Sequence, residues 1–190
     1  MHVWKAFWTM KEILKRWTKY IVIFMLAFWL TAQYNEYRQL KEFEQVRKEL
    51  IRQEQEAVKD QERKCLKNAL YYEARSEGTI GILAVASVIE NRKNHVNYPS
   101  SYCGVIKQHK QFSYTLEGRP DVERIERRLK AADKVMYGYV SEVADNMLEG
   151  EFEPVLEHSV LWYAHKKIKN AWIKTKQTYA TIGNHRFYKE

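Results

Sequence analysis

The sequence has few residues that could hold a metal ion. It contains two cysteines and six histidines in 190 residues. Cys65 and Cys103 lie far apart, no CxxC pair occurs, and the histidines are scattered along the chain. Zinc sites in proteins draw on closely spaced Cys and His ligands. We therefore expect a protein with no metal and no cofactor.

The sequence also lacks the stripe of Lys and Arg with interleaved aromatic residues that is typical of nucleic-acid-binding proteins. The formal net charge is +8, and basic and acidic residues are mixed. We therefore do not expect a nucleic-acid partner. With 29% charged and 14% aromatic residues, the chain is too apolar to be disordered. A modest basic excess suits a polyanionic partner, such as a cell wall that carries acidic peptides.

Long hydrophobic runs are absent, and the apolar run Ile21–Ala32, which contains no charge, has twelve residues. Trp17 and Tyr34 flank it as candidate interfacial anchors, and the 18 residues they bound would span about 27 Å as a helix. Five basic residues and one acidic residue, Glu12, precede the run. The basic residues are Lys5, Lys11, Lys15, Arg16 and Lys19.

The N-terminal region accordingly predicts an uncleaved, single-pass signal anchor over residues 20–34 in the inner membrane. The basic segment 1–19 would stay in the cytoplasm, and the C-terminal domain would lie outside it, in the periplasm or cell envelope. Leu30 and Ala32 fit the small-residue rule for cleavage poorly. A cleaved signal peptide and a buried helix of a soluble protein are the alternatives.

Residues 35–64 contain no Gly or Pro and are rich in helix-forming charged residues. They predict a helical stalk of about 45 Å between the anchor and a domain over residues 65–190.

The domain begins with an apolar stripe whose last member is a carboxylate. Leu66, Ala69, Leu70 and Glu73 follow the i, i+3, i+4, i+7 spacing of one helix face, and Gly78 would end this helix. Burial raises the pKa of a carboxyl group, which keeps a general acid protonated near neutral pH. Glu73 is therefore a candidate catalytic acid. It could instead lie at the edge of the stripe or pair with Arg75.

The rest of the domain predicts an α+β fold, with helices first and a small antiparallel sheet near the C-terminus. We expect a buried helix over Gly81–Arg92, a loop or hairpin over Gln111–Pro120, and a helix from Asp121 to Tyr139. A strand over Ser159–His165 and a terminal turn and strand over Ala180–Lys189 complete the pattern.

Six segments then occur in an order that resembles the SleB-type cell-wall hydrolases, the family of the spore-cortex-lytic enzyme. They are YYEAR (71–75), GILAVASVIENR (81–92), YPSSYCGVI (98–106), QFSY (111–114), VLWYAHKKIKNAW (160–172) and IGNHRFY (182–188). The resemblance covers residues 65–189 and leaves residues 1–61 outside it. It implies a lysozyme-like α+β domain that cleaves peptidoglycan glycan strands as a lytic transglycosylase, with Glu73 as the catalytic residue. An envelope or phage-lysis setting (an endolysin) suits the anchor and stalk.

The sequence departs from the family pattern at two places. Tyr114 stands where members often carry Trp, and Tyr163-Ala164-His165 replaces their YHA, which puts any role of His165 in doubt.

A lytic transglycosylase can work with one carboxyl group, whereas ordinary glycosidases need two. Glu73 would protonate the glycosidic oxygen and then accept the proton of the muramoyl C6 hydroxyl. Glu77, at i+4, could be a second carboxylate or a solvent-exposed residue at the helix end. The candidate glycan-binding residues are Gln111, Ser113, Tyr114, Tyr163 and His185, whereas Phe112, Trp162 and Phe187 are expected in the core.

Three other functions stay open. A zinc amidase that removes the stem peptide would need ligands such as His158, His165 and His185. A muramidase would use water with Glu73 and Glu77. A non-catalytic protein would only tether the wall.

If the domain lies in an oxidising compartment, Cys65 and Cys103 form a disulfide, and otherwise they are two buried thiols.

Overall fold

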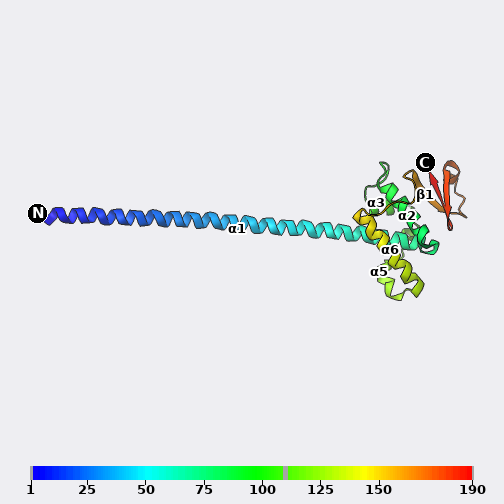
Figure 1. Ribbon diagram of the computed structural model, residues 1–190, viewed down its shortest axis with the longest axis horizontal. Helices are drawn as coiled ribbons and strands as arrows, with labels where there is room; N and C mark the ends of the chain where they lie inside the picture. Colours follow the sequence, from blue (N-terminus) through cyan, green and yellow to red (C-terminus); the bar gives the residue numbers. More distant parts are fainter. Residues whose placement is uncertain (1, 109–110, 190) are drawn as a thin grey trace. The chain divides into compact units, whose positions relative to one another are not determined.

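The computed structural model describes residues 2–108 and 111–189. The chain divides into two compact units, Met1–Gln55 and Glu56–Glu190. One helix, α1 (His2–Ala74), supplies the whole of the first unit and enters the second (Figure 1). Its uninterrupted length follows from the absence of Gly and Pro, the residues that most weaken a helix interior.

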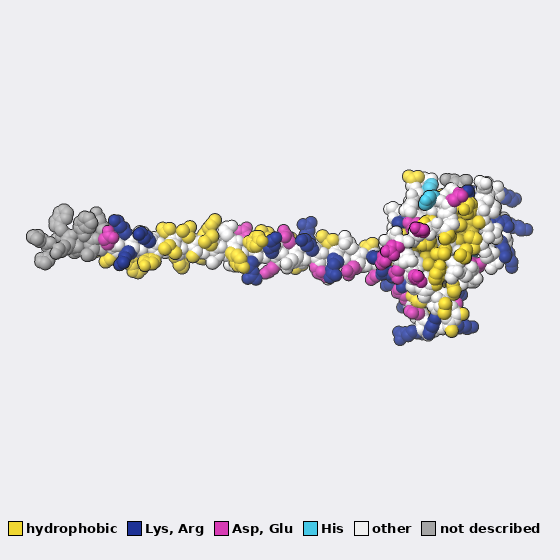
Figure 2. Space-filling model, in the orientation of Figure 1, with side chains coloured by type: hydrophobic (Ala, Val, Ile, Leu, Met, Phe, Trp, Pro, Cys, Tyr) yellow, Lys and Arg dark blue, Asp and Glu magenta, His cyan; other side chains and the backbone are white. Residues whose placement is uncertain are grey.

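In the first unit, large apolar side chains are exposed around the helix, among them Phe24 and Trp29 (Figure 2). In the part of the chain that the structure describes, no helix is long and apolar enough to cross a membrane. The anchor predicted for residues 20–34 is therefore not supported. The apolar run Ile21–Ala32 is twelve residues long, whereas a span needs about 20. Met1 and the side chains of residues 2–9 and 11, in the predicted basic segment 1–19, lie outside the described residues.

The second unit places its helices before its strands, which confirms the predicted fold class. The elements after α1 are η1 (Arg75–Glu77), α2 (Gly78–Lys93), α3 (Tyr102–Ile106), α4 (Ser113–Leu116), α5 (Val122–Ile125), η2 (Glu126–Arg128), α6 (Ala131–Glu149), β1 (Val160–His165), η3 (Ala171–Thr175), β2 (Gln177–Ile182) and β3 (His185–Lys189). The strands form one antiparallel sheet in the order β1-β3-β2.

Helix α2 lies at the centre of the core. Its residues Ile82, Val85 and Ile89 are fully buried, as expected for a helix that is apolar nearly all round. It packs against α6 and β1. The stripe on α1 is buried as predicted, since Leu66, Ala69 and Leu70 are also fully buried.

Two sequence predictions about local structure were wrong. The helix predicted from Asp121 to Tyr139 is broken into α5, η2 and α6, because Leu129 and Lys130 adopt extended backbone angles. The predicted loop over Gln111–Pro120 contains the helical turn α4. No Gly or Pro marks the break at Leu129, so the local sequence carries no signal for it.

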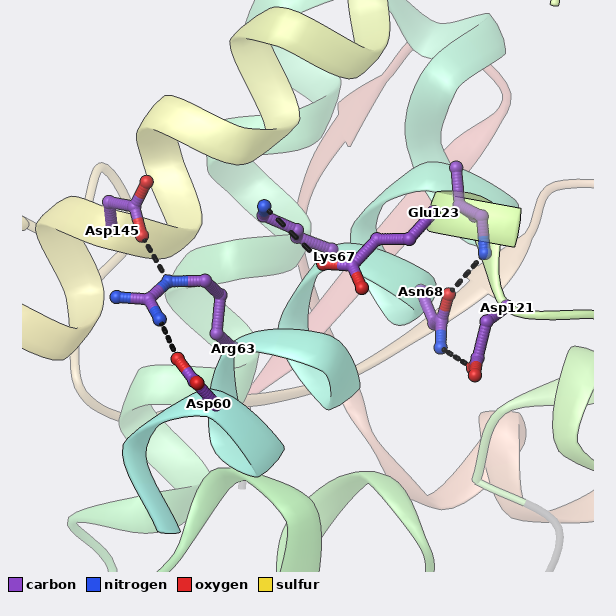
Figure 3. A network of polar contacts seen from close by, with 8 residues as sticks. Asp60, Arg63, Lys67, Asn68, Asp121, Glu123 and Asp145 are labelled. Atoms are coloured by element: carbon purple, nitrogen blue, oxygen red, sulfur yellow. Dashed lines mark hydrogen bonds and ion pairs between the residues drawn. The ribbon is translucent and has the colours of Figure 1, made fainter. Parts of the chain in front are cut away.

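A polar network fixes the end of α1 to α5 and α6 (Figure 3). The guanidinium of Arg63 donates to Asp145 at 2.7 Å. Asn68 donates from Nδ2 to Asp121 at 2.7 Å and accepts from the backbone N–H of Val122 at 2.9 Å. These contacts set the position of the last turns of α1, where Glu73 lies.

Helix α1 is also joined to α3. A disulfide joins Cys65 to Cys103, with their Cα atoms 5.3 Å apart. One carboxylate oxygen of Glu62 accepts from the backbone N–H groups of Tyr102 and Cys103, at 2.6 and 3.2 Å. The start of α3 is therefore held to α1 by a covalent bond and a charged cap.

Candidate active site

Glu73 lies in the last turn of α1, and Ser113 approaches it from the start of α4. The backbone N–H and the hydroxyl of Ser113 both donate to Oε1 of Glu73, at 3.0 and 3.1 Å. The structure thus brings together two predicted site residues that are 40 positions apart. The backbone N–H of Tyr114 also donates to this carboxyl group.

The pKa of Glu73 is raised above its ordinary value. Burial is the largest cause, because it disfavours the charged form. Hydrogen bonds from Ser113 and from the backbone of Tyr114 act in the opposite direction, and the charge of Glu117 adds a small further rise. A carboxyl group in this balance can hold a proton at a pH where exposed carboxyl groups have lost theirs.

Tyr114 packs beside this carboxyl group. Its ring stacks on that of Tyr72 with the centroids 5.4 Å apart, and the hydroxyl of Tyr72 donates to the carbonyl oxygen of Pro120 at 2.6 Å. Burial, and then the charge of Glu73, raise the pKa of Tyr114, so its hydroxyl stays protonated as a hydrogen-bond donor.

Tyr163 and His185 form a second group on neighbouring strands. Their ring centroids are 5.2 Å apart, and the ring of Phe187 lies 5.9 Å from that of Tyr163. Burial, and next the charge of Glu73, raise the pKa of the Tyr163 hydroxyl. The ring of Tyr163 lies 6.4 Å from that of Phe112, which precedes Ser113 in the chain. Burial lowers the pKa of His185, which therefore stays neutral near pH 7.

Gln111 lines a pocket of about 250 Å³ with Tyr163. Its other lining residues are Arg92, Trp162, Trp172 and Lys176. Glu73 is not one of them, so this pocket does not enclose the carboxyl group. Phe112 and Phe187 are fully buried, as predicted, but Trp162 is only partly buried and faces this pocket, which corrects its assignment to the core.

Glu77 does not lie beside Glu73 on one helix. Helix α1 ends at Ala74, and Glu77 closes the 3-10 turn η1, so the predicted i+4 relationship fails. Its carboxylate accepts from the backbone N–H and the side chain of Asn184, at 2.5 and 3.3 Å. Burial by itself would raise the pKa of Glu77, but the hydrogen bonds of Asn184 outweigh it and the pKa is lowered. Glu77 is an ionised structural residue at the turn between β2 and β3.

The histidines considered as metal ligands do not converge. The rings of His165 and His185 are 6.3 Å apart, and His165 accepts from the backbone N–H of Lys167. Within residues 2–108 and 111–189, no three His, Cys, Asp or Glu side chains are arranged to hold a metal ion.

Residues 76–188 match the model of the Cell Wall Hydrolase family. The chain belongs to this family. The match spans α2, the pocket residues and the whole sheet, and it begins three residues after Glu73. No curated protein matches the chain.

Two solved structures are similar to this cell wall hydrolase. The catalytic domain of the germination-specific lytic transglycosylase SleB from Bacillus anthracis is 26% identical, covers 67% of this chain and 93% of its own, and has a TM-score of 0.49. The catalytic domain of the SleB protein from Bacillus cereus is 24% identical, covers 67% of this chain and 89% of its own, and has a TM-score of 0.47.

The sequence did not point to five residues of the site in this cell wall hydrolase. Each of them contacts a predicted site residue or lines the same pocket: Tyr72, Arg92, Trp162, Trp172 and Lys176. A weak signal existed for two of them, because Tyr72 precedes Glu73 and Arg92 ends the apolar helix as a charged residue. No local pattern pairs Lys176 with α2.

Proposed function

We propose that this cell wall hydrolase cleaves the peptidoglycan backbone between N-acetylmuramic acid and N-acetylglucosamine as a lytic transglycosylase. The supporting observation is the state of Glu73: its pKa is raised and Ser113 holds one of its oxygens. Two other carboxylates could act with Glu73: Glu77, which is close in sequence, and Glu117, whose charge affects the pKa of Glu73. Each of them is bound by another residue, Glu77 by Asn184 and Glu117 by Arg119 at 2.7 Å.

The reaction needs only this carboxyl group. Since Ser113 donates twice to Oε1, Oε2 would carry the proton and give it to the glycosidic oxygen as the bond to muramoyl C1 breaks. The C6 hydroxyl oxygen of the same muramoyl residue then bonds to C1, and its proton returns to the Glu73 carboxylate. Two chain ends result, one of them a 1,6-anhydro ring, and no water is consumed.

The groups around Glu73 suit a sugar substrate. Tyr114 and Tyr163 stay protonated, and their rings offer apolar faces to a pyranose. Gln111 adds an amide that can pair with sugar hydroxyls. We assign these residues, with Ser113 and His185, to glycan binding.

The location follows from the substrate. Peptidoglycan lies outside the cytoplasm, and a disulfide such as Cys65–Cys103 persists in oxidising compartments. We therefore propose that the second unit acts in the cell envelope.

Product mass tests the proposal. Purified sacculi digested with the wild-type protein should release muropeptides that end in 1,6-anhydro-muramic acid, lighter than the hydrolytic products by one water. Glu73→Gln is nearly isosteric and should reduce the rate by about 10²–10⁴-fold. Glu117→Gln should stay within a few-fold of wild type and is the matched control.

Other products would identify the competing functions. Reducing-end muramic acid would indicate a muramidase, and free stem peptides lost in EDTA would indicate a zinc amidase. Binding to sacculi without any cleavage, unchanged by Glu73→Gln, would indicate a tethering protein.

A further inference from the structure

The pocket that Gln111 and Tyr163 line also has a buried cation, Arg92, with an unused donor. Arg92 is 3% exposed, and its Nε donates to the carbonyl oxygen of Leu161 at 2.6 Å. Its Nη1 has no hydrogen-bond partner among the described residues. Burial lowers the pKa of Arg92, yet an arginine keeps its charge in proteins. A buried, unpartnered guanidinium nitrogen is costly, and an acceptor would remove this cost.

The other lining residues complete a site for an anionic sugar. The hydroxyl of Tyr163 is also buried without a partner among the described residues. The ammonium of Lys176 lies 3.7 Å from the centre of the Trp162 ring, and Trp172 adds a second indole. None of the described residues that line the pocket is acidic.

The segment that carries the sheet is basic. Residues 158–189 contain six lysines and one arginine and no Asp or Glu, although Lys189 is paired with Glu157. Figure 2 shows Lys and Arg side chains at the edge of the second unit where Figure 1 draws the sheet. Such a field draws anions towards the pocket.

We propose that this pocket is a carboxylate-binding subsite for the acidic substituent of muramic acid. The carboxylate accepts from Nη1 of Arg92 and from the Tyr163 hydroxyl, Lys176 adds charge, and the indoles of Trp162 and Trp172 contact the sugar. Through the subsite, the enzyme distinguishes muramic acid from the neutral N-acetylglucosamine on either side of the scissile bond. The inference rests on the proposed function for its ligand class.

Binding of ligands that contain no glycan bond to cleave tests the subsite apart from catalysis. Isothermal titration would compare N-acetylmuramic acid, its methyl ester, and N-acetylmuramoyl dipeptide, in which the lactyl carboxyl is an amide and the peptide carries the charge. The methyl ester should bind roughly tenfold or more weakly than the free acid, because it cannot form charge-assisted hydrogen bonds. The free acid and the dipeptide separate the lactyl carboxylate from the stem peptide as the source of the charge.

Lys176→Met should weaken the binding of the acidic ligands several-fold, and Lys176→Arg should restore it. Lys174→Met is the matched control, since Lys174 is exposed and does not line the pocket. Arg92→Lys should abolish the difference between acid and ester, with circular dichroism to verify folding. Equal binding of acid and ester, equal effects of Lys176→Met and Lys174→Met, or binding of inorganic phosphate alone would each overturn the subsite. Digestion of sacculi by the wild-type protein tests the proposed cleavage, whereas ligand binding tests the subsite. The subsite can therefore fail while the proposed cleavage holds, and the reverse.

Discussion

Ser113 gives both of its donors to one oxygen of Glu73. This pairing holds Oε1 of the carboxyl group at the start of α4. It also limits how far burial can raise the pKa of Glu73, because hydrogen bonds from Ser113 favour the charged form.

Replacing Ser113 with Ala should therefore raise the pKa of Glu73 further. Activity requires protonated Glu73 and is lost as pH rises through its pKa. The alkaline limb of the kcat/KM profile should move to higher pH, with the plateau reduced by less than about tenfold, the effect of one hydrogen bond. Ser113→Thr keeps a hydroxyl and should leave the limb near its wild-type position. A limb that stays in place in Ser113→Ala, or moves to lower pH, contradicts this role.

Glu73→Gln should stabilise the protein at neutral pH. A carboxyl group whose pKa is raised in the folded state releases its proton first in the unfolded state, so folding stability falls as pH rises from the unfolded pKa to the folded one. Gln has no such titration. Urea unfolding should show the variant to be the more stable protein at pH 7, with the difference shrinking below about pH 4. A wild type that is more stable at pH 7 would show that the carboxylate is not penalised by burial.

Glu77→Gln should weaken the fold and leave the chemistry in place. The carboxylate accepts two hydrogen bonds from Asn184, and hydrogen bonds to a charged group contribute about 1.5–3 kcal/mol each. Since the folded pKa of Glu77 is lowered, this contribution is present above the unfolded pKa and is lost as pH falls through the folded pKa. Chemical denaturation at pH 7 and pH 3 measures it. Loss of activity equal to that of Glu73→Gln, in a folded protein, would instead make Glu77 a second catalytic carboxylate.

Gly183→Ala tests the contact between Glu77 and the turn that contains Asn184 by changing the turn instead of the carboxylate. Gly183 has φ +58°, and an added Cβ would lie 2.1 Å from the Glu77 carboxylate. We expect a loss of at least about 1 kcal/mol, because the conformation and the contact both disfavour a side chain. Gly118→Ala is the control, since it shares a positive φ but has open space around it. Equal losses would show that backbone conformation alone is responsible.

Removing the disulfide by Cys65→Ser with Cys103→Ser should cost about 4 kcal/mol in the chain-entropy account of a loop of this length. Thermal unfolding with and without reductant measures it: reductant should lower the Tm of the wild type and leave that of the double variant unchanged. Two thiols that react with a labelling reagent in the denatured, non-reduced protein would rule out the bridge.

The sequence predicted those parts of the fold that depend on periodic burial. Leu66, Ala69 and Leu70 mark the buried face of α1, and the same spacing places Glu73 on that face. Helix α2 and strand β1 were equally predictable, because their apolar residues have no other place in a small domain.

What the sequence could not predict depends on contacts between distant segments. Glu77 was placed beside Glu73 on the assumption that α1 continues to Gly78, whereas α1 ends at Ala74 and Asn184 takes up the carboxylate. Arg92 and Lys176 line one pocket because Arg92 donates to Leu161 on β1 and Lys176 lies over the ring of Trp162 on the same strand. No spacing in the chain encodes this proximity.

The disulfide and the acid share one helix, eight residues apart, and this has a consequence for insertions and deletions. Each residue added between Cys65 and Glu73 would turn the carboxyl group by about 100° around the helix axis and advance it by about 1.5 Å. A single insertion there would point Glu73 away from Ser113, and even a whole added turn would displace it by more than 5 Å. The helix before Glu56 carries no such angular constraint, so its length can change without altering the direction in which the acid points.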